Sequence, residues 1–422
     1  MNLLKTTLGN GLTVVLRETH SAPVTSVWIW YRVGSRNEHL GITGISHWVE
    51  HMLFKGTARW PRQKLDQAIA REGGYLNGMT WYDFTTYFET LPSAKAYLAL
   101  DIEADRMTNA LFDADEVAAE RTVVISERQG NENDPTFLLD EELTAAAFRV
   151  HPYGHDTIGH LCDLQTLTRD DLYAHYRTYY TPNNAILAAA GDFNAGEMLR
   201  MIERAFDKIP SRGPLPHVTA QEPPQRGERR VIVEGNAGTD YLTLAFHTPP
   251  ATHPDLHALT VLSTVLAGGA GSLVGSGSLT NYTSRLYRAV VARDLAAEVN
   301  ASLIPTVDPG LYRISATVLP GHTSTEVEDA LRAELELLRH EPITAEELAK
   351  AIRQARALFA FSSESITNQA FWLGFSEIFA DTSWFLHYLE RLEAVTAEDV
   401  LRVADAYLRP QNMTVGHYLT QD

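Results

Sequence analysis

Three side chains near the start of the chain have the types and the spacing to bind a metal ion and use it. His47, Glu50 and His51 stand at positions i, i+3 and i+4 within the run Gly44–Gly56. In a helix all three would leave one face within a single turn. Two imidazoles four residues apart can hold one divalent ion, and zinc prefers nitrogen donors in a tetrahedral array. Glu50 can then act as a general base on a water molecule, in the H-x-x-E-H order that reverses the commoner H-E-x-x-H.

A catalytic zinc site needs a third protein ligand and one open position. A helix is expected over residues 114–128, with Asp113 as its N-cap, and it carries two candidates. Glu120 and Glu127 are seven residues apart and therefore lie on one face of that helix. One carboxylate can bind the metal while the other hydrogen-bonds a histidine ligand. Spacing alone leaves open which carboxylate does which, and a merely solvated helix face is the alternative.

Length and charge restrict the possible classes of protein. A chain of 422 residues is too long for one hydrophobic core and predicts two or more domains. The formal net charge of −18 argues against nucleic acid as the main partner, because a phosphate binder needs a basic surface. The lone cysteine, Cys162, excludes an internal disulfide, suits a reducing compartment and is expected to be a small buried side chain. No secretory signal and no run approaching about 18 apolar residues is found, so we expect a cytoplasmic protein without a membrane span.

Apolar alternation and turn signals predict the elements of the first half. A hairpin is expected at the start, because two short strands flank Asn10-Gly11, a strong signal for a type I′ turn. A long strand is expected over residues 24–33, with Trp28 and Trp30 in the core. Further strands are expected over residues 84–91 and 185–190, and a helix over residues 194–206.

The second half repeats the first. Residues 210–227 are rich in proline and glycine, which predicts an inter-domain linker, and strands restart at residues 230–234 and 241–247. Six residues recur after 228 positions: Leu164, Thr168, Asp171, Tyr179, Pro182 and Asn184 match Leu392, Thr396, Asp399, Tyr407, Pro410 and Asn412. Each set predicts a helix capped by threonine, a proline that ends it, and a final strand.

Such a long period favours two tandem domains from a duplication. We therefore expect an α+β fold of two similar domains, each a mixed or antiparallel sheet with helices packed on one face. The boundaries are 1–209 for a zinc-binding catalytic domain, 210–227 for the linker and 228–422 for a domain without metal, because H-x-x-E-H is absent from the second half.

The stretches Gly44–Thr57, Glu120–Glu127 and Gly73–Thr80 resemble the pitrilysin/insulinase family of zinc metallopeptidases, which includes the β-subunit of the mitochondrial processing peptidase and two-domain bacterial processing proteases. In that family the third ligand is a glutamate about 76 positions after the second histidine, where Glu127 stands. The resemblance implies that His47, His51 and Glu127 bind Zn²⁺, that Glu50 is the general base and that Glu120 supports a histidine by hydrogen bonding. It also implies that Asn77 touches the substrate backbone.

The second half departs from the family pattern at one informative place. After Ser284-Arg285-Leu286-Tyr287, active members continue with an arginine and a tyrosine that contact the substrate carbonyl, whereas this chain has Val291 and Ala297 there. Arg293 and Tyr287 do not fall in register. The resemblance therefore implies a homologous partner subunit without metal that supplies both groups. The glycine-rich run Gly268–Gly277 fits neither phosphate-binding motif and is expected to be a flexible connector or a gate over the substrate.

The expected function is zinc-dependent endopeptidase action on extended or unfolded peptides, as the metal-bearing subunit of a heterodimer. A peptide could add as a strand to a sheet edge, which selects unfolded segments. Two alternatives stay open: a catalytically silent assembly subunit, and a self-sufficient homodimeric peptidase.

Overall fold

The computed structural model describes residues 3–268 and 282–421, which form two compact units. The first unit comprises residues 3–129, 155–219 and 363–385, and the second comprises residues 130–154, 220–268, 282–362 and 386–421. Compared with contiguous domains 1–209 and 228–422, the two units exchange residues 130–154 and 363–385. The segment 130–154 carries α5 (Pro135–Ala147), and the segment 363–385 carries α12 (Ile366–Phe379) and most of α13 (Thr382–Leu386). Helices α5 and α12 each pack on the sheet of the unit that contains them.

The first unit is built on a six-stranded mixed sheet with the order β1-β2-β6-β3-β5-β4. Neighbouring strands are antiparallel except β2 and β6, which are parallel. The strands expected from sequence are confirmed, and β4 is an additional strand. The bounds are β1 Leu3–Thr7, β2 Thr13–Glu18, β3 Val24–Tyr31, β4 Tyr75–Thr80, β5 Thr85–Pro92 and β6 Ala185–Gly191.

The predicted hairpin between β1 and β2 is present, but the predicted turn type is wrong. The amide of Gly11 donates to Leu8 O at 2.9 Å, and the amide of Leu8 donates to Leu12 O at 2.9 Å. The loop therefore has three residues, and Gly11 takes the positive φ of 90° that closes it. A turn followed by a left-handed glycine is the usual form of a three-residue hairpin loop.

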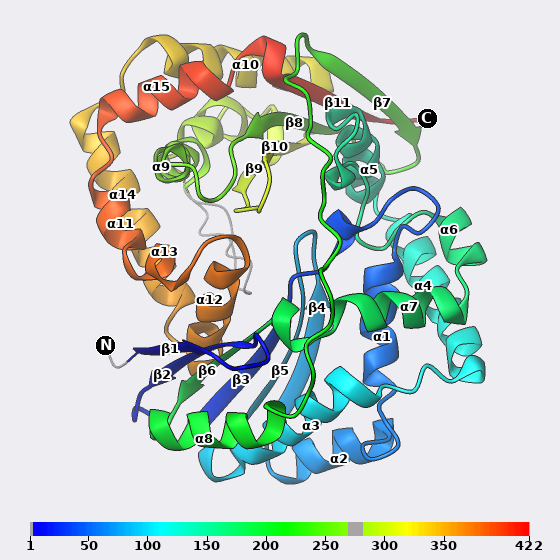
Figure 1. Ribbon diagram of the computed structural model, residues 1–422. Coiled ribbons are helices and arrows are strands. Elements are labelled where there is room, and N and C mark those ends of the chain that lie inside the picture. Colours follow the sequence, from blue (N-terminus) through cyan, green and yellow to red (C-terminus); the bar gives the residue numbers. More distant parts are fainter. Residues whose placement is uncertain (1–2, 269–281, 422) are drawn as a thin grey trace. The chain divides into compact units, whose positions relative to one another are not determined.

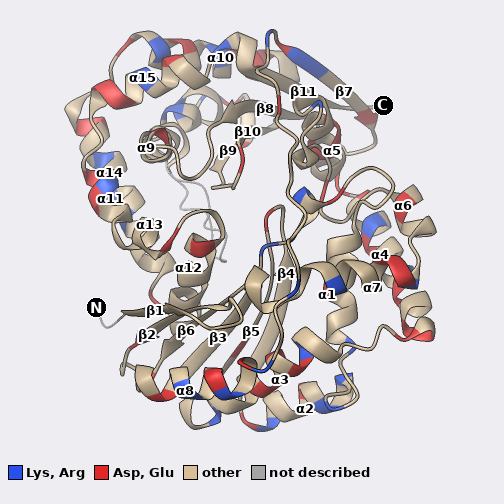
Figure 2. Cartoon of the chain, in the orientation of Figure 1, with Lys and Arg blue, Asp and Glu red and all other residues tan. Residues whose placement is uncertain are grey.

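Helices cover both faces of this sheet (Figure 1). On one face, α1 (Ile45–Phe54), α3 (Ala96–Asn109) and α8 (Ala195–Phe206) share a buried apolar core with the odd-numbered side chains of β3. On the other face, α12 (Ile366–Phe379) packs on β3 and β6. Figure 2 shows these two strands without charged residues, as expected of strands buried on both faces.

Helix α12 packs on two aromatic residues of β3. The indoles of Trp28 and Trp30 are buried, and each contacts the ring of Phe371 at centroid distances of 5.4 and 5.2 Å. Gly374 lets the helix approach, because a Cβ at this position would overlap the indole of Trp30. The expectation that these tryptophans lie in the core is confirmed, and the distant helix explains why they are not exposed.

A buried ionic cluster joins β5 to α3. The guanidinium of Arg106 lies 2.5 Å from the carboxylate of Glu103 and 3.9 Å from that of Glu89, and it stacks on the ring of Tyr87 at 4.6 Å. All four side chains are buried. Two acids and one base cannot all be charged there without a large cost, and burial together with the charge of Glu103 raises the pKa of Glu89 well above its ordinary value.

The second unit is built on a five-stranded mixed sheet with the order β7-β11-β8-β10-β9. Its core lies between the sheet and α9 (Asp255–Ala267), α10 (Ser324–His340) and α15 (Ala397–Tyr407). On the other face, α5 (Pro135–Ala147) packs on β7, β8 and β11. The strands are β7 Arg229–Gly235, β8 Tyr241–Thr248, β9 Ala296–Leu303, β10 Gly310–Val318 and β11 Met413–Thr420.

The two sheets have the same topology apart from the extra edge strand β1. In each, one outer strand runs parallel to its neighbour and the remaining pairs are antiparallel. This agreement confirms the predicted repeat and the α+β fold class. The expectation that helices pack on only one face of each sheet is wrong, because α12 and α5 cover the second faces.

The residues that recur after 228 positions have the same structural roles in both units. Thr168 and Thr396 cap their helices, each in a reciprocal pair with an aspartate three residues later. Asn184 donates to Tyr179 O at 2.9 Å, and Asn412 donates to Tyr407 O at 2.8 Å. The same local chemistry therefore ends the helix and starts the last strand of each sheet.

The remaining elements complete the chain. They are the helices α2 Arg62–Arg71, α4 Ala114–Asn131, α6 Leu161–Thr166, α7 Arg169–Tyr179, α11 Ala345–Ser362, α13 Thr382–Leu386 and α14 Tyr388–Glu393, the π-helix Tyr287–Val291, and short 3₁₀ turns at Ser35–Asn37, Ser93–Lys95, Pro152–Gly154, Pro182–Asn184 and Pro410–Asn412. No helix in the described part of the chain is long and apolar enough to cross a membrane.

Cys162 and the glycine-rich run Gly268–Gly277 were the subject of two further expectations from sequence. The prediction that Cys162 is buried is wrong: its thiol is exposed, because Asp163 and Leu164 take the inward positions of α6. The glycine-rich run expected to be a connector or a gate lies, from residue 269 onward, outside the described residues.

Candidate metal centre

Helix α1 carries the three residues of the H-x-x-E-H motif. Its apolar residues, including Trp48, Val49 and Met52, are buried in the core of the first unit. His47 and His51 leave the opposite side one turn apart, and their ring centroids lie 4.6 Å from each other. The amphipathic pattern of the helix thus fixes both imidazoles on one face, as expected.

A carboxylate from outside the helix caps the N-terminus of α1. Gly44, at the N-cap, has no side chain and adopts a φ of 84°. Instead, Glu38 accepts hydrogen bonds from the amides of Gly44 and Ser46, each at 2.8 Å, and from His155 Nε2 at 3.1 Å. A negative charge at this position satisfies free amides and stabilises the positive end of the helix dipole. Glu38 is buried, so it also fixes the direction in which α1 leaves the loop.

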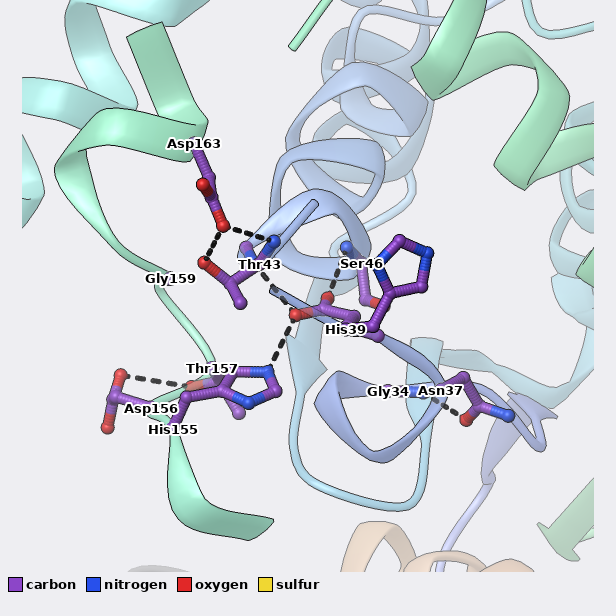
Figure 3. Close-up of polar contacts among 12 residues, drawn as sticks. Gly34, Asn37, His39, Thr43, Ser46, His155, Asp156, Thr157, Gly159 and Asp163 are labelled. Carbon is purple, nitrogen blue, oxygen red and sulfur yellow. Dashed lines mark hydrogen bonds and ion pairs between the residues drawn. The ribbon is translucent and has the colours of Figure 1, made fainter. Parts of the chain in front are cut away.

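A second carboxylate holds the loop that precedes α1 (Figure 3). Asp163 accepts from the amides of Gly41 and Thr43 at 3.0 Å each and from the hydroxyl of Thr43 at 2.7 Å. The Thr43 hydroxyl oxygen accepts in turn from the amide of His160 at 2.8 Å. These contacts connect the segment 155–163 to the loop before α1 and hold that loop in place.

Helix α4 brings the two candidate glutamates to α1. Its Asp113 caps the helix as predicted, accepting from the amides of Asp115 and Glu116. The helix is anchored by Arg121, which donates to the carbonyl oxygens of Leu164 and Leu167 and stacks on the ring of Trp48 at 5.1 Å. This packing sets the distance from α4 to α1.

The geometry of three side chains fits one metal ion. Glu127 lies with one carboxylate oxygen 3.8 Å from His47 Nε2 and the other 3.5 Å from His51 Nε2. The ligand atoms of the three residues all lie within 4.8 Å of one another. Tetrahedral zinc bonds of about 2.0–2.2 Å would place two ligands about 3.3–3.5 Å apart. The observed separations are too long for strong hydrogen bonds and close to those of a shared ion.

Glu120 occupies a different position from Glu127. Its carboxylate accepts from His51 Nδ1 at 2.9 Å and from the ammonium group of Lys55. Burial alone would raise the pKa of Glu120, but the hydrogen bonds from His51 and Lys55 outweigh it and lower the pKa to about 2. A charged carboxylate on Nδ1 fixes the proton there, so the lone pair of His51 lies on Nε2, facing Glu127.

The protonation states of His47 and Glu50 suit metal binding and proton transfer. Burial lowers the pKa of His47 to about 4, helped by the positive charge that His51 carries when it is protonated, so the imidazole of His47 is neutral at pH 7 and can donate a lone pair. Burial raises the pKa of Glu50, opposed by a hydrogen bond that Thr80 Oγ1 donates to Glu50 Oε2 at 2.7 Å. A carboxylate with a raised pKa is a better acceptor of a proton from water.

Asn77 is not brought to the side of the sheet that faces Glu50. Side chains alternate along β4, and Thr80, at its end, points toward Glu50. Asn77 is three residues earlier and therefore points to the opposite face, where it is exposed and accepts from the amide of Gly78 at 2.9 Å. The backbone of Asn77 lies in β4, the strand that packs against α1.

Three residues of the site were not recognised from sequence: Glu38, Asp163 and Thr80. Glu38 and Asp163 act on the loop before α1 from 6 and 120 positions away, counted to Gly44 and Thr43. No local spacing signals such contacts. Thr80, in contrast, belongs to the segment Gly73–Thr80 that carries the family resemblance.

Comparisons with known proteins agree with the fold. A family model described as Insulinase (Peptidase family M16) matches residues 13–160, and one described as Peptidase M16 inactive domain matches residues 166–355. An uncharacterised zinc protease of Mycobacterium tuberculosis is 30% identical over 409 residues, which cover 95% of this chain and 89% of that protein. A probable mitochondrial-processing peptidase subunit beta of Arabidopsis thaliana is 28% identical over 424 residues, with 97% and 77% covered. The crystal structure of a protease from Helicobacter pylori has a TM-score of 0.93 at 28% identity and 99% coverage of both chains.

Two repeats of one mixed sheet, of which the first carries the H-x-x-E-H helix, form the fold of a class of two-domain peptidases. The chain belongs to peptidase family M16, the insulinase family.

Proposed function

We propose that this chain is a zinc endopeptidase that hydrolyses extended or unfolded peptides. The observation that carries the proposal is the convergence of His47, His51 and Glu127 on one point beside the carboxylate of Glu50. Relatives named zinc proteases support the same activity. Imidazole and carboxylate donors with a hydrolytic task favour zinc over harder ions such as magnesium.

The residues divide the chemistry between them. When bound, zinc would lower the pKa of a water molecule and polarise the scissile carbonyl. Glu50 accepts the proton of the attacking water and then donates it to the leaving amine. Glu120 holds the His51 ring in the tautomer and the orientation that a ligand needs.

The substrate would bind as an added strand along β4. Among the described strands β4 lies at the edge of its sheet, paired with β5, and it packs against α1. Backbone groups on an edge can pair with an extended peptide, which a folded protein does not offer. The role of Asn77 in binding this backbone stays a proposal, and its exposed position leaves the side chain accessible.

We also propose that the chain works with a homologous metal-free subunit. The support is the departure from family pattern, with Val291 and Ala297 in place of the arginine and tyrosine that stabilise the transition state. A relative named as the beta subunit of a peptidase fits a divided enzyme. The single cysteine supports a reducing compartment such as the cytoplasm.

A quenched-peptide assay tests both proposals. The chain is purified alone and together with a similar chain encoded next to it, each with and without Glu50→Gln. We expect hydrolysis mainly by the pair, and a loss of about 100-fold or more with Glu50→Gln at unchanged zinc content. Equal activity with and without the second chain would support the homodimer instead. A chain that binds no zinc at stoichiometric level would point to an assembly subunit.

A further inference from the structure

The hydroxyl of Thr80 touches the proposed general base directly. Thr80 Oγ1 lies 2.7 Å from Glu50 Oε2, and both side chains are less than a tenth exposed. A hydrogen bond to a carboxylate in a site shielded from water is stronger than one between neutral groups. Thr80 thus contacts the carboxylate but none of the three candidate metal ligands.

A neighbouring threonine offers the Thr80 hydroxyl a second acceptor besides Glu50. Thr85 Oγ1 lies 3.3 Å from Thr80 Oγ1 and donates its own proton to Val33 O at 2.9 Å. A hydroxyl has one proton to give. Because that of Thr85 is used on the carbonyl, Thr85 can only accept from Thr80. The contact of Thr80 Oγ1 with Glu50 Oε2 is shorter than its contact with Thr85 Oγ1, so Thr80 donates to Glu50.

The strand pairing holds both hydroxyls in place. Thr80 and Thr85 are direct partners in the antiparallel ladder of β4 and β5, and Thr85 is fully buried. Directly opposed side chains are close, and β-branched residues have few rotamers. The donor is therefore positioned before any substrate binds.

We propose that Thr80 is a positioning residue, which holds Oε2 of Glu50 so that Oε1 is the oxygen that takes the proton from water and returns it to the amine. This role rests on the proposed peptidase function. A misplacement of about 1 Å in a reacting group can cost about 100-fold in rate, which sets the scale of the effect.

Three variants separate the hydroxyl from the shape of the side chain. Thr80→Val keeps the branched shape without the hydroxyl, and Thr80→Ser keeps the hydroxyl. Thr86→Val is the matched control, because Thr86 is a buried threonine on the neighbouring strand β5, next to Thr85, and its hydroxyl donates to Ile29 O at 2.8 Å on the other face of the sheet. We expect Thr80→Val to lower kcat about 10–100-fold at unchanged KM and zinc content, Thr80→Ser to stay within about 3-fold, and Thr86→Val within about 2-fold.

Full kcat in Thr80→Val, or an equal loss in Thr80→Ser, would overturn the proposal, as would a loss of zinc from Thr80→Val. Crystal structures of the same variants give a readout that needs no activity: the Glu50 carboxylate should leave its position in Thr80→Val and keep it in Thr80→Ser. An unmoved Glu50 in Thr80→Val would refute the positioning role. An inactive parent chain in which Glu50 moves as expected would refute the peptidase function alone.

Discussion

Removing the charge of Glu120 is the sharpest test of how the metal site is supported. The variant Glu120→Gln keeps the size of the side chain and one oxygen for His51 Nδ1, now 2.9 Å away, but it loses the negative charge. The imidazole of His51 should then be a weaker donor toward the metal and should lose its fixed tautomer. The fold should persist, because Glu120 lies at the edge of the core.

The size of the effect follows from the state of the carboxyl group. A fall of the pKa of Glu120 from 4.5 to about 2 corresponds to roughly 3 kcal/mol in favour of the charged form. His51 and Lys55 share this energy, because both donate to the Glu120 carboxylate. About 1–2 kcal/mol remains for His51, which predicts a zinc affinity about 5–30-fold weaker and overlaps the range for such supporting residues.

The chain offers a matched control for this measurement. Glu116 also pairs with Lys55, with Nζ 3.2 Å from its carboxylate, but the structure places it on Lys55 and not on His51. We expect Glu116→Gln to leave the zinc affinity unchanged within about 2-fold. Affinity is measured by competition with a chelator at fixed pH. If Glu120→Gln binds zinc as tightly as the parent, or if Glu116→Gln weakens binding equally, the supporting role of Glu120 is wrong.

Two further predictions concern stability, measured by urea unfolding. Gly374→Ala should destabilise the chain by about 1–3 kcal/mol despite the better helix propensity of alanine, because the new methyl group overlaps a buried indole. Gly130→Ala, on α4 with open space around it, should stabilise the chain by up to about 1 kcal/mol. Equal effects of the two substitutions would contradict the close packing of α12 on Trp30. Because the pKa of Glu89 is raised by burial and by Glu103, the folded chain keeps a proton that the unfolded chain releases above about pH 4.5, so this residue lowers stability as pH rises. Glu89→Gln should therefore flatten the decline between about pH 5 and 8, and an unchanged pH slope in this variant would refute the buried proton. Glu103→Gln should destabilise the chain, because it removes the nearer of the two carboxyl groups that face Arg106.

Features encoded by neighbouring residues were predictable from the sequence. The reciprocal caps at Thr168 and Thr396 need only an aspartate three residues later, so a spacing rule finds them. The face of α1 with His47 and His51 follows from helical periodicity in the same way. The repeat could be recognised because such local signals recur in the same order.

Features that depend on distant parts of the chain could not be predicted. The sequence of α5 or α12 does not show which unit the helix belongs to. An apolar surface on a helix predicts that it packs on a sheet, but it does not predict which of the two sheets. Glu38 and Asp163 look like ordinary loop acids until folding brings them to the start of α1. The hairpin turn shows a finer limit: Asn10-Gly11 signalled a turn correctly, but the pairing of Leu8 with Leu12 decided its type.

The convergence of two histidines and one glutamate on zinc is tested most directly by diffraction from zinc-loaded crystals at the zinc absorption edge. We expect one anomalous peak per chain, about 2.0–2.2 Å from His47 Nε2, from His51 Nε2 and from a carboxylate oxygen of Glu127. A peak that lacks Glu127 among its ligands, or zinc bound only elsewhere on the chain, would contradict the account.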